Sequence, residues 1–376
     1  MKLIHISDLH IGKRLKEHSL IDDQRYILGE ILRIVSEERP DGVLIAGDVY
    51  DKSVPSTEAV SLLDDFLFQL SRTARVFIIS GNHDSAERLS FASRLIEGAG
   101  IYICRGFSGA PDSVTLTDGY GECDIYMLPF VKPASVRRFY PEREIESYTD
   151  AVEACLSGIE REGERRRVLL THQFVTGASR TESEELSVGG ADNVDASVFE
   201  GFDYVALGHL HRAQTAGGEN IRYSGTPLKY SFSECYDEKS VTVVELRAKG
   251  DTEIRTVALT PMRDMAELRG AYDELMSKDF YDGKDFRDAY LRITLTDEED
   301  VVDAKMRMSV VYPHILSVRY DKSRTAAMGS EAEYSETRGK SPSELFSDFF
   351  EMRAGKSMSE DQRGLVDGLI EDIWGE

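Results

Sequence analysis

The chain has 376 residues, with 45 Lys and Arg against 68 Asp and Glu, which gives a formal net charge of −23. Its length predicts two or three domains, because a compact domain is typically about 100–200 residues long, and its hydrophobic content of 41% is that of a globular protein. The charge argues against a protein that coats nucleic acid through a generally basic surface, although it does not exclude a local basic groove.

Short apolar runs recur through the first 260 residues, each rich in Ile, Val and Leu, as is typical of strands buried on both faces. They are Leu3–Ile6, Val43–Ala46, Val76–Ile79, Ile101–Cys104, Ile125–Leu128, Val168–Leu170, Tyr204–Leu207 and Val241–Leu246. Helical patterns separate the early runs, whereas the runs from about 200 to 260 follow one another closely. Residues 1–262 are therefore predicted to form an α/β layered domain with one more antiparallel side.

A second, small α+β domain is predicted over residues 263–325. Its elements are read from apolar spacing. A helix is expected from Met265, Leu268, Tyr272 and Leu275, a strand at Tyr290–Leu295, a second helix from Val302, Met306 and Val310, and a second strand at Ile315–Tyr320.

The C-terminal part is predicted to be a linker followed by two helices. Residues 326–340 have almost no apolar content, which indicates a flexible linker. In segment 341–376, Ser341-Pro342-Ser343-Glu344 is a capping box with proline at the first helical position, and a second helix begins at Ser359. Apolar side chains four residues apart give each helix a broad apolar stripe: Leu345, Phe346, Phe349, Phe350, Leu365, Leu369, Ile370, Ile373 and Trp374.

These two short helices are too small to bury both stripes against each other. We therefore expect segment 341–376 to bind a partner protein, with docking back onto the rest of the chain as the alternative. Its acidic character argues against DNA binding.

The N-terminus and the cysteines indicate a cytosolic protein. Met1 is followed by an Asp within eight residues, with no apolar signal-peptide region, and no run of about 20 apolar residues predicts a membrane span. The four cysteines (Cys104, Cys123, Cys155 and Cys235) form no C-x-x-C pair, so reduced, mostly buried thiols are expected.

Five polar motifs follow apolar runs at the point where each predicted strand ends. They are Asp8-Leu9-His10, Gly47-Asp48-Val49-Tyr50-Asp51, Gly81-Asn82-His83-Asp84, Thr171-His172-Gln173 and Gly208-His209-Leu210-His211. Functional groups of α/β sheets gather beyond the carboxyl ends of the strands. Five of the eight histidines of the chain lie in these motifs. A single site built from all five motifs is therefore predicted.

The candidate ligands are two Asp, one Asn and four His, and none is a thiolate, which speaks against a structural zinc site. Oxygen and imidazole ligands together favour Mn²⁺, with iron and Mg²⁺ as alternatives. Seven ligands are too many for one ion with an open position, whereas two ions about 3.5–4 Å apart account for them. Asp48 is the expected bridge because it follows the predicted central strand Val43–Ala46.

In this order the motifs resemble those of the calcineurin-like metallophosphoesterases, and in detail those of nuclease subunits that work with a coiled-coil ATPase. The resemblance implies a four-layer αββα sandwich with a cap domain. It assigns Asp8, His10, Asp48 and His211 to a first metal, and Asp48, Asn82, His172 and His209 to a second. His83 is implied as a catalytic residue that binds no metal, with Asp84 expected to orient it. Asp51 stands where some relatives carry a second catalytic histidine.

The resemblance also implies double-strand exonuclease and single-strand or hairpin endonuclease activity, and docking of the ATPase on the C-terminal helices. Lys13, Arg14 and Lys16 are candidate DNA contacts, with a solvated loop as an equal alternative. The resemblance also implies a homodimer formed by helices at 56–70 and 86–96. These helices carry more apolar residues than one core stripe needs, and the alternative is that the surplus residues are ordinary core: Phe66, Phe68, Phe91 and Leu95.

Two rival functions remain possible, a small-molecule phosphodiesterase or phosphatase and a scaffold with a vestigial site. The chain has no P-loop motif, so ATP hydrolysis is expected from another protein.

Overall fold

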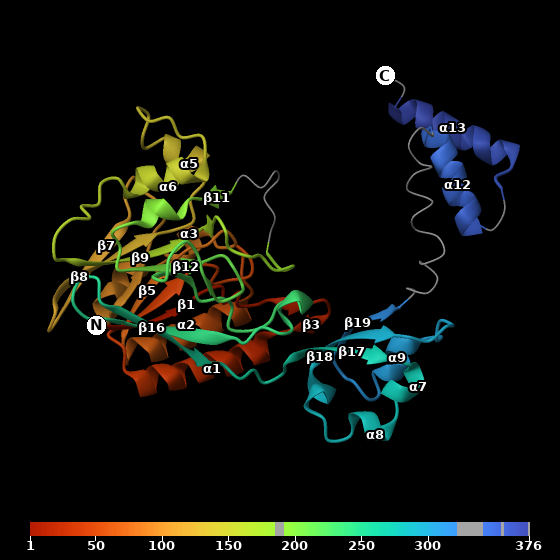
Figure 1. The fold of residues 1–376 in the computed structure, drawn as a ribbon, viewed down its shortest axis with the longest axis horizontal. Coiled ribbons are helices and arrows are strands. Elements are labelled where there is room, and N and C mark those ends of the chain that lie inside the picture. Colours follow the sequence, from red (N-terminus) through yellow and green to blue (C-terminus); the bar gives the residue numbers. More distant parts are fainter. Residues whose placement is uncertain (185–191, 322–340, 355–356, 375–376) are drawn as a thin grey trace.

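The structure, a computed structural model, describes residues 1–184, 192–321, 341–354 and 357–374. Two six-stranded sheets lie face to face in its N-terminal part (Figure 1). The first sheet has the order β16 (Thr252–Ala258), β15 (Ser240–Leu246), β1 (Lys2–Ile6), β4 (Gly42–Ala46), β5 (Arg75–Ile79) and β6 (Ile101–Ile103). The second has the order β13 (Gln214–Thr215), β14 (Ile221–Tyr223), β12 (Tyr204–Gly208), β9 (Arg166–His172), β8 (Gly121–Leu128) and β7 (Asp112–Asp118).

Helices cover the outer face of each sheet, which makes four layers (Figure 1). α1 (Ile21–Glu38) and α2 (Thr57–Ser71) share one apolar cluster with the first sheet. α5 (Pro133–Arg137) and α6 (Tyr148–Leu156) share another with the second. A third cluster lies between the two sheets and takes side chains from both, including Leu44, Phe77 and Leu170. The predicted αββα sandwich is confirmed.

The central strands of both sheets run parallel and are buried on both faces, which explains their continuous apolar sequence. β1, β4, β5 and β6 pair in parallel, as do β8, β9, β12 and β14. β15 pairs antiparallel with both β1 and β16, so the expected antiparallel side is confirmed. Two-residue strands, β2 (Arg14–Leu15) with β3 (His18–Ser19) and β10 (Phe174–Val175) with β11 (Asn193–Val194), fix the loops near the sheet edge.

The C-terminal α+β unit contains three parallel strands with their own apolar core. Its elements are β17 (Met265–Gly270), α7 (Tyr272–Leu275), α8 (Lys278–Tyr281), β18 (Tyr290–Leu295), α9 (Ala304–Met308) and β19 (Ile315–Tyr320). We call this unit the cap. The two predicted strands are present.

The first predicted helix of the cap is only partly present: Tyr272 and Leu275 lie in α7, whereas Met265 and Leu268 belong to strand β17, which pairs in parallel with β18. Met265 and Leu268 are three residues apart, which suits a helix, but strand β17 also buries Met265, Leu268 and Gly270. Pairing with the neighbouring strand therefore decides the conformation, and the local apolar spacing does not. The stripe predicted for the second helix is wrong. Val302, Met306 and Val310 are largely exposed, and α9 instead buries Ala304 and Met308.

The expected helix at 86–96 is interrupted. It consists of α3 (Ala86–Leu89) and α4 (Ser93–Ile96), with Ala92 between them in the left-handed region at φ 61°. Phe66 on α2 is core, whereas Phe91 and Leu95 are 83% and 84% exposed and Phe68 is exposed too. Three of the four residues counted as surplus are therefore surface residues.

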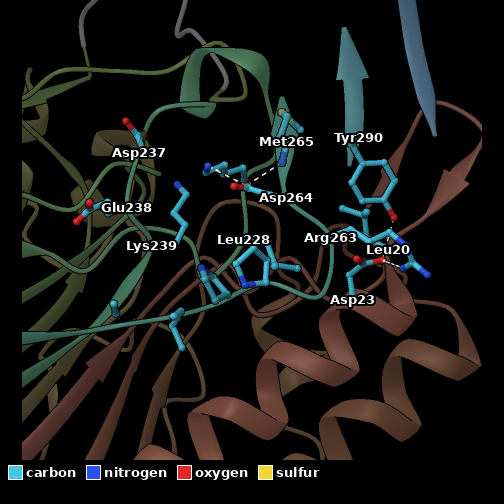
Figure 2. A pocket seen from close by; sticks show the side chains of 15 residues that line it. Leu20, Asp23, Leu228, Asp237, Glu238, Lys239, Arg263, Asp264, Met265 and Tyr290 are labelled. Atoms are coloured by element: carbon cyan, nitrogen blue, oxygen red, sulfur yellow. Dashed lines mark hydrogen bonds and ion pairs between the residues drawn. The ribbon is translucent and has the colours of Figure 1, made fainter. Parts of the chain in front are cut away.

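The cap is joined to the N-terminal part of the chain by polar contacts that are buried or partly buried. Asp23 on α1 accepts hydrogen bonds from Arg263 Nη1 (3.0 Å) and from the Tyr290 hydroxyl (2.9 Å), as Figure 2 shows. Lys16 Nζ donates to the Leu316 carbonyl at 2.6 Å. Asp23, Arg263 and Tyr290 border a cavity of about 340 Å³ between the cap and the sandwich.

The C-terminal segment forms α12 (Pro342–Ala354) and α13 (Glu360–Trp374). The predicted capping box is present, because the Ser341 hydroxyl accepts from the Glu344 N–H (3.3 Å) and Glu344 Oε2 accepts from the Ser341 N–H (2.7 Å). Five of the predicted stripe residues are exposed: Leu345, Phe346, Phe349, Leu365 and Leu369. Phe350 and Ile370 are half-buried. The side chains of Ile373 and Trp374, and the predicted linker at 326–340, lie outside the described residues.

In the described part of the chain, no helix is both long and apolar enough to cross a bilayer. The four cysteines are buried and unbridged, as expected.

A buried histidine in β1 makes stability depend on pH. His5 Nδ1 lies 2.8 Å from the Tyr204 hydroxyl, and burial, aided by the Arg222 guanidinium, lowers the pKa of His5 to about 3. The unfolded chain takes up this proton near pH 6.5, so the contribution of His5 to stability is present above that pH and is lost as the pH falls towards 3. For each pH unit by which the pH falls between these two pKa values, the free energy of unfolding decreases by about 1.4 kcal/mol.

We therefore expect the unfolding free energy to fall by about 2 kcal/mol more in the parent than in His5→Gln when the pH drops from 7.5 to 5. Urea denaturation at both pH values, with chelator present throughout, measures the difference. Equal losses in the two proteins would contradict the assignment.

Candidate metal centre

The five motifs meet at one edge of the sandwich, where strands of both sheets end. Asp8, Asp48 and Asn82 follow β1, β4 and β5, and His172, His209 and His211 follow β9 and β12. Four of the site residues have left-handed backbones: Asp8 (φ 53°), His10 (φ 43°), Asp48 (φ 47°) and His209 (φ 105°). Strained backbone of this kind concentrates at functional sites.

Two glycines allow the loops to come this close. A Cβ on Gly208 would lie 1.8 Å from the Ala46 carbonyl oxygen, and one on Gly81 would lie 2.1 Å from Asp48 Oδ1. Neither position therefore accepts a side chain without displacing the residues of the site.

The first group of candidate ligands contains Asp8, His10 and His211, all buried. His10 Nε2 and His211 Nε2 lie 3.2 Å apart. Asp8 accepts hydrogen bonds from the His209 N–H through both carboxylate oxygens, at 3.0 and 3.2 Å, so its orientation is fixed by the loop after β12.

The second group surrounds the Asn82 amide oxygen. His172 Nε2 lies 3.1 Å and His209 Nδ1 3.0 Å from Asn82 Oδ1. His172 donates from Nδ1 to the Ala46 carbonyl (2.8 Å), which leaves its Nε2 lone pair for a ligand. Asp48 Oδ2 lies 3.3 Å from His172 Nε2 and 3.8 Å from His10 Nε2, so the carboxylate of Asp48 is close to both groups.

This donor set fits divalent cations. Asp48 and Asp8 each take part in more than one of the clusters whose ligand atoms lie within 4.8 Å of one another. Carboxylate and imidazole donors converge in these clusters, and the Asn82 amide oxygen lies beside two of the imidazoles. Hard or borderline divalent ions prefer this combination of donors.

The charge balance of the site points the same way. Burial raises the pKa of Asp8 to about 6, whereas His172, with smaller effects from His10 and His83, holds the pKa of Asp48 well below its usual range despite burial. Burial alone would lower the pKa of His172, but the carboxylates of Asp48 and Asp8 raise it to about 9. Burial lowers the pKa of His209 to about 3. In the absence of a cation, the proton on His172 balances the carboxylates, and a bound cation would take over that role.

His83 lies at the rim of this cluster and is less buried than the candidate ligands. Its Nε2 lies 4.0 Å from Asp48 Oδ2, its N–H donates to Asp48 Oδ1 (2.9 Å), and its Nδ1 donates to the Asp51 carbonyl (3.1 Å). The ring is thus oriented by the backbone of Asp51.

Asp84 does not take the expected place beside the ring of His83. Its carboxylate accepts hydrogen bonds from the N–H groups of Val49 (3.1 Å), Tyr50 (2.9 Å) and Gly81 (3.0 Å). It therefore joins the loops after β4 and β5, which carry Asp48 and Asn82. Burial and the charge of Asp48 raise the pKa of Asp84 to about 6.

The three basic candidates for DNA contacts differ in their surroundings. Lys13 Nζ pairs with Asp51 Oδ1 at 2.8 Å, and Lys16 Nζ donates a hydrogen bond to the Leu316 carbonyl of the cap. Arg14 is exposed and donates to the Glu17 carbonyl. Arg14 and Lys16 are both exposed, whereas Lys13 is half-buried.

Sequence reasoning missed the groups that hold His211. Glu184 Oε1 accepts from the His211 N–H (2.6 Å), and the Ser183 hydroxyl lies 2.7 Å from His211 Nδ1 and from Glu234 Oε1. Lys239 Nζ pairs with Glu234 Oε2 at 2.7 Å. These residues belong to no polar motif at a strand end, so only the fold brings them together.

Comparison with known proteins agrees with this geometry. Residues 1–213 match the family model described as calcineurin-like phosphoesterase, and residues 261–354 match one described as type 5 capsule protein repressor C-terminal domain. A dimetal phosphatase from Danio rerio aligns with 69% of this chain and 99% of its own at 13% identity and a TM-score of 0.37, a likeness too weak to decide the fold.

Two curated relatives, both SbcD subunits of the nuclease SbcCD, align over 323 residues at 32% identity. The one from Staphylococcus epidermidis is covered over 85% of its length and the one from Staphylococcus saprophyticus over 84%, each by 85% of this chain. The chain therefore belongs to the calcineurin-like phosphoesterases and, among them, to the family of SbcD nuclease subunits, which confirms the predicted metal-dependent hydrolase.

Proposed function

We propose that this chain is the nuclease subunit of an SbcCD-type complex that hydrolyses DNA phosphodiesters at duplex ends, hairpins and single strands. The observation that carries the proposal is the convergence of two buried carboxylates, one amide and four imidazoles at the edge shared by both sheets. Kinship with SbcD nuclease subunits supports DNA as the substrate.

Asp8, His10, Asp48 and His211 would hold one cation, and Asp48, Asn82, His172 and His209 a second. Mn²⁺ suits this mixture of oxygen and imidazole donors. When bound, two such ions lower the pKa of a water and neutralise phosphodiester oxygens.

His83 is the proposed proton donor to the leaving oxygen. The Asp51 carbonyl accepts from Nδ1, so the proton given to the leaving oxygen would be the second proton of the imidazolium, on Nε2, which lies on the Asp48 side of the site. The ring is partly open to solvent, which lets it meet a substrate that enters from the rim.

The substrate assignment is tested by comparing linear duplex DNA and a single-stranded hairpin with cyclic nucleotides, in Mn²⁺, with and without an SbcC-type ATPase. We expect cleavage of both DNA substrates, with duplex-end degradation enhanced by the ATPase and ATP. Hydrolysis of cyclic nucleotides without DNA cleavage would favour a small-molecule phosphodiesterase. No bound metal at saturating Mn²⁺ would favour a scaffold.

For the partners, we propose that an SbcC-type ATPase binds the C-terminal helices α12 and α13, and that Phe91 and Leu95 with Phe68 form a homodimer contact. The exposed apolar side chains at both places support this. Sedimentation of Phe91→Glu, expected to be monomeric, tests the dimer.

Deleting residues 341–376 is expected to abolish co-purification with the ATPase and to leave Mn²⁺-dependent cleavage of short DNA by the isolated nuclease within about twofold, because the deletion removes no metal ligand. The single change Phe349→Glu should weaken the same interaction by placing a charge in an apolar contact. Glu351→Ala, on the exposed surface of α12, is the matched control. Undiminished co-purification of the truncated chain would assign the ATPase to another surface.

A further inference from the structure

His211 is held by a chain of three polar side chains that the proposed chemistry does not use. The Ser183 hydroxyl lies 2.7 Å from His211 Nδ1 and 2.7 Å from Glu234 Oε1. Glu234 Oε2 pairs with Lys239 Nζ at 2.7 Å. Glu234 is fully buried and Lys239 nearly so. We call Ser183, Glu234 and Lys239 the His211 relay.

The direction of these hydrogen bonds follows from the chemistry of the groups. A carboxylate only accepts, so the single hydroxyl proton of Ser183 goes to Glu234, and the oxygen of Ser183 must accept from His211. His211 therefore carries its proton on Nδ1 and presents a lone pair on Nε2, the atom that lies 3.2 Å from His10 Nε2.

Lys239 closes the relay on the backbone of the same histidine. Besides Glu234, its ammonium group donates to the His211 carbonyl (2.9 Å) and to the Thr226 hydroxyl (2.9 Å), so all three of its protons have acceptors. Both the ring and the backbone of His211 are thus fixed by one buried ion pair.

The other histidines of the site are held by neutral groups or less firmly. His172 donates from Nδ1 to the Ala46 carbonyl. Within the described residues, His10 Nδ1 is buried without a hydrogen-bond partner. Because a hydrogen bond to a carboxylate system strengthens an imidazole as a ligand, His211 should be the stronger imidazole of the pair His10 and His211.

We propose that the His211 relay positions His211, in tautomer and in orientation, as the anchoring ligand of the first cation site. This rests on the proposed metal centre. Ser183, Glu234 and Lys239 are positioning residues, since they act only through His211.

The test is calorimetric titration of the metal-free full-length protein with Mn²⁺. For the parent we expect two ions per chain. For Ser183→Ala we expect the affinity for one ion to fall by about 10- to 100-fold, as is typical when the hydrogen-bond partner of a metal-bound histidine is removed, and the affinity for the other to stay within about threefold. Ser183 is only half-buried, so this change should leave the fold intact.

Two further variants separate positioning from mere packing. Ser183→Thr keeps the hydroxyl and should restore the affinity. Ser179→Ala is the matched control in the same segment, because the Ser179 hydroxyl faces Gln214 and does not reach the relay.

A double variant removes the ion pair without leaving a lone buried charge. Lys239 and Leu228 both line the cavity (Figure 2), and methionine is an unbranched, uncharged side chain of similar length to lysine, so Glu234→Gln with Lys239→Met should fold. It should weaken the same single site as Ser183→Ala.

Unchanged affinities for both ions in Ser183→Ala would overturn the relay and leave the proposed function in place. A loss that Ser183→Thr does not restore would also overturn it. A parent protein that binds no Mn²⁺ would overturn the metal centre itself, and the relay with it.

Discussion

Replacing Asp48 with asparagine is expected to lower kcat/KM for DNA cleavage by about 10³-fold, or about 4 kcal/mol. Asp48 Oδ2 lies within 4.0 Å of ring nitrogens of three histidines, His172, His10 and His83, so its negative charge is central to the site. Asparagine retains the carbonyl oxygen that accepts the His83 N–H, so the loop should keep its shape. The expected loss therefore reflects charge and ligation.

Nuclease assays and Mn²⁺ titration of Asp48→Asn measure this effect, and at least one of the two ions should be lost. Asp65→Asn, on the exposed side of α2, removes the same charge from the surface and should behave as the parent does. Activity within tenfold of the parent would show that Asp48 does not join the two cation sites.

The second large effect is expected from His83→Gln, which should lower kcat by about 10²- to 10³-fold, as the loss of a positioned general acid typically does. Both ions should stay bound and KM should change little, because His83 is proposed to act on the leaving oxygen. A nitrophenyl phosphodiester has a leaving group that needs no proton, so its hydrolysis should suffer much less than DNA cleavage.

His314→Gln is the matched control, since its side chain is as exposed as that of His83 (22% against 20%) and lies in the cap. Equal losses on DNA and on the nitrophenyl ester would argue against proton donation by His83. Loss of an ion in His83→Gln would instead make His83 a ligand.

The sandwich was predictable because each central strand is an uninterrupted apolar run. Such a run needs apolar neighbours on both faces of the strand, which is the position of a parallel strand between two layers. The candidate site was predictable for a related reason. Parallel strands bring their carboxyl ends to one edge, so the polar residues after β1, β4, β5, β9 and β12 meet there.

What could not be predicted depends on contacts between segments far apart in the sequence. Met265 and Leu268 form a strand because β18 offers hydrogen bonds to it, which no local spacing reveals. Asp84 turns to three backbone N–H groups instead of its neighbour His83. Ser183 and Glu234 meet at His211 although 51 residues separate them.

The distribution of the candidate ligands over both sheets has a mechanical consequence. Asp8, Asp48 and Asn82 extend from the first sheet, and His172, His209 and His211 from the second. A cation held by these residues would therefore bridge the two sheets, which already share the apolar cluster between them and hydrogen bonds such as those of His5 with Tyr204 and of His172 with the Ala46 carbonyl. At a free concentration of 100 times its Kd, each ion that binds only the folded state adds about 2.7 kcal/mol to the free energy of unfolding. Chelation would then lower the free energy of unfolding of the whole sandwich, so the cations would stabilise the fold as well as serve as cofactors.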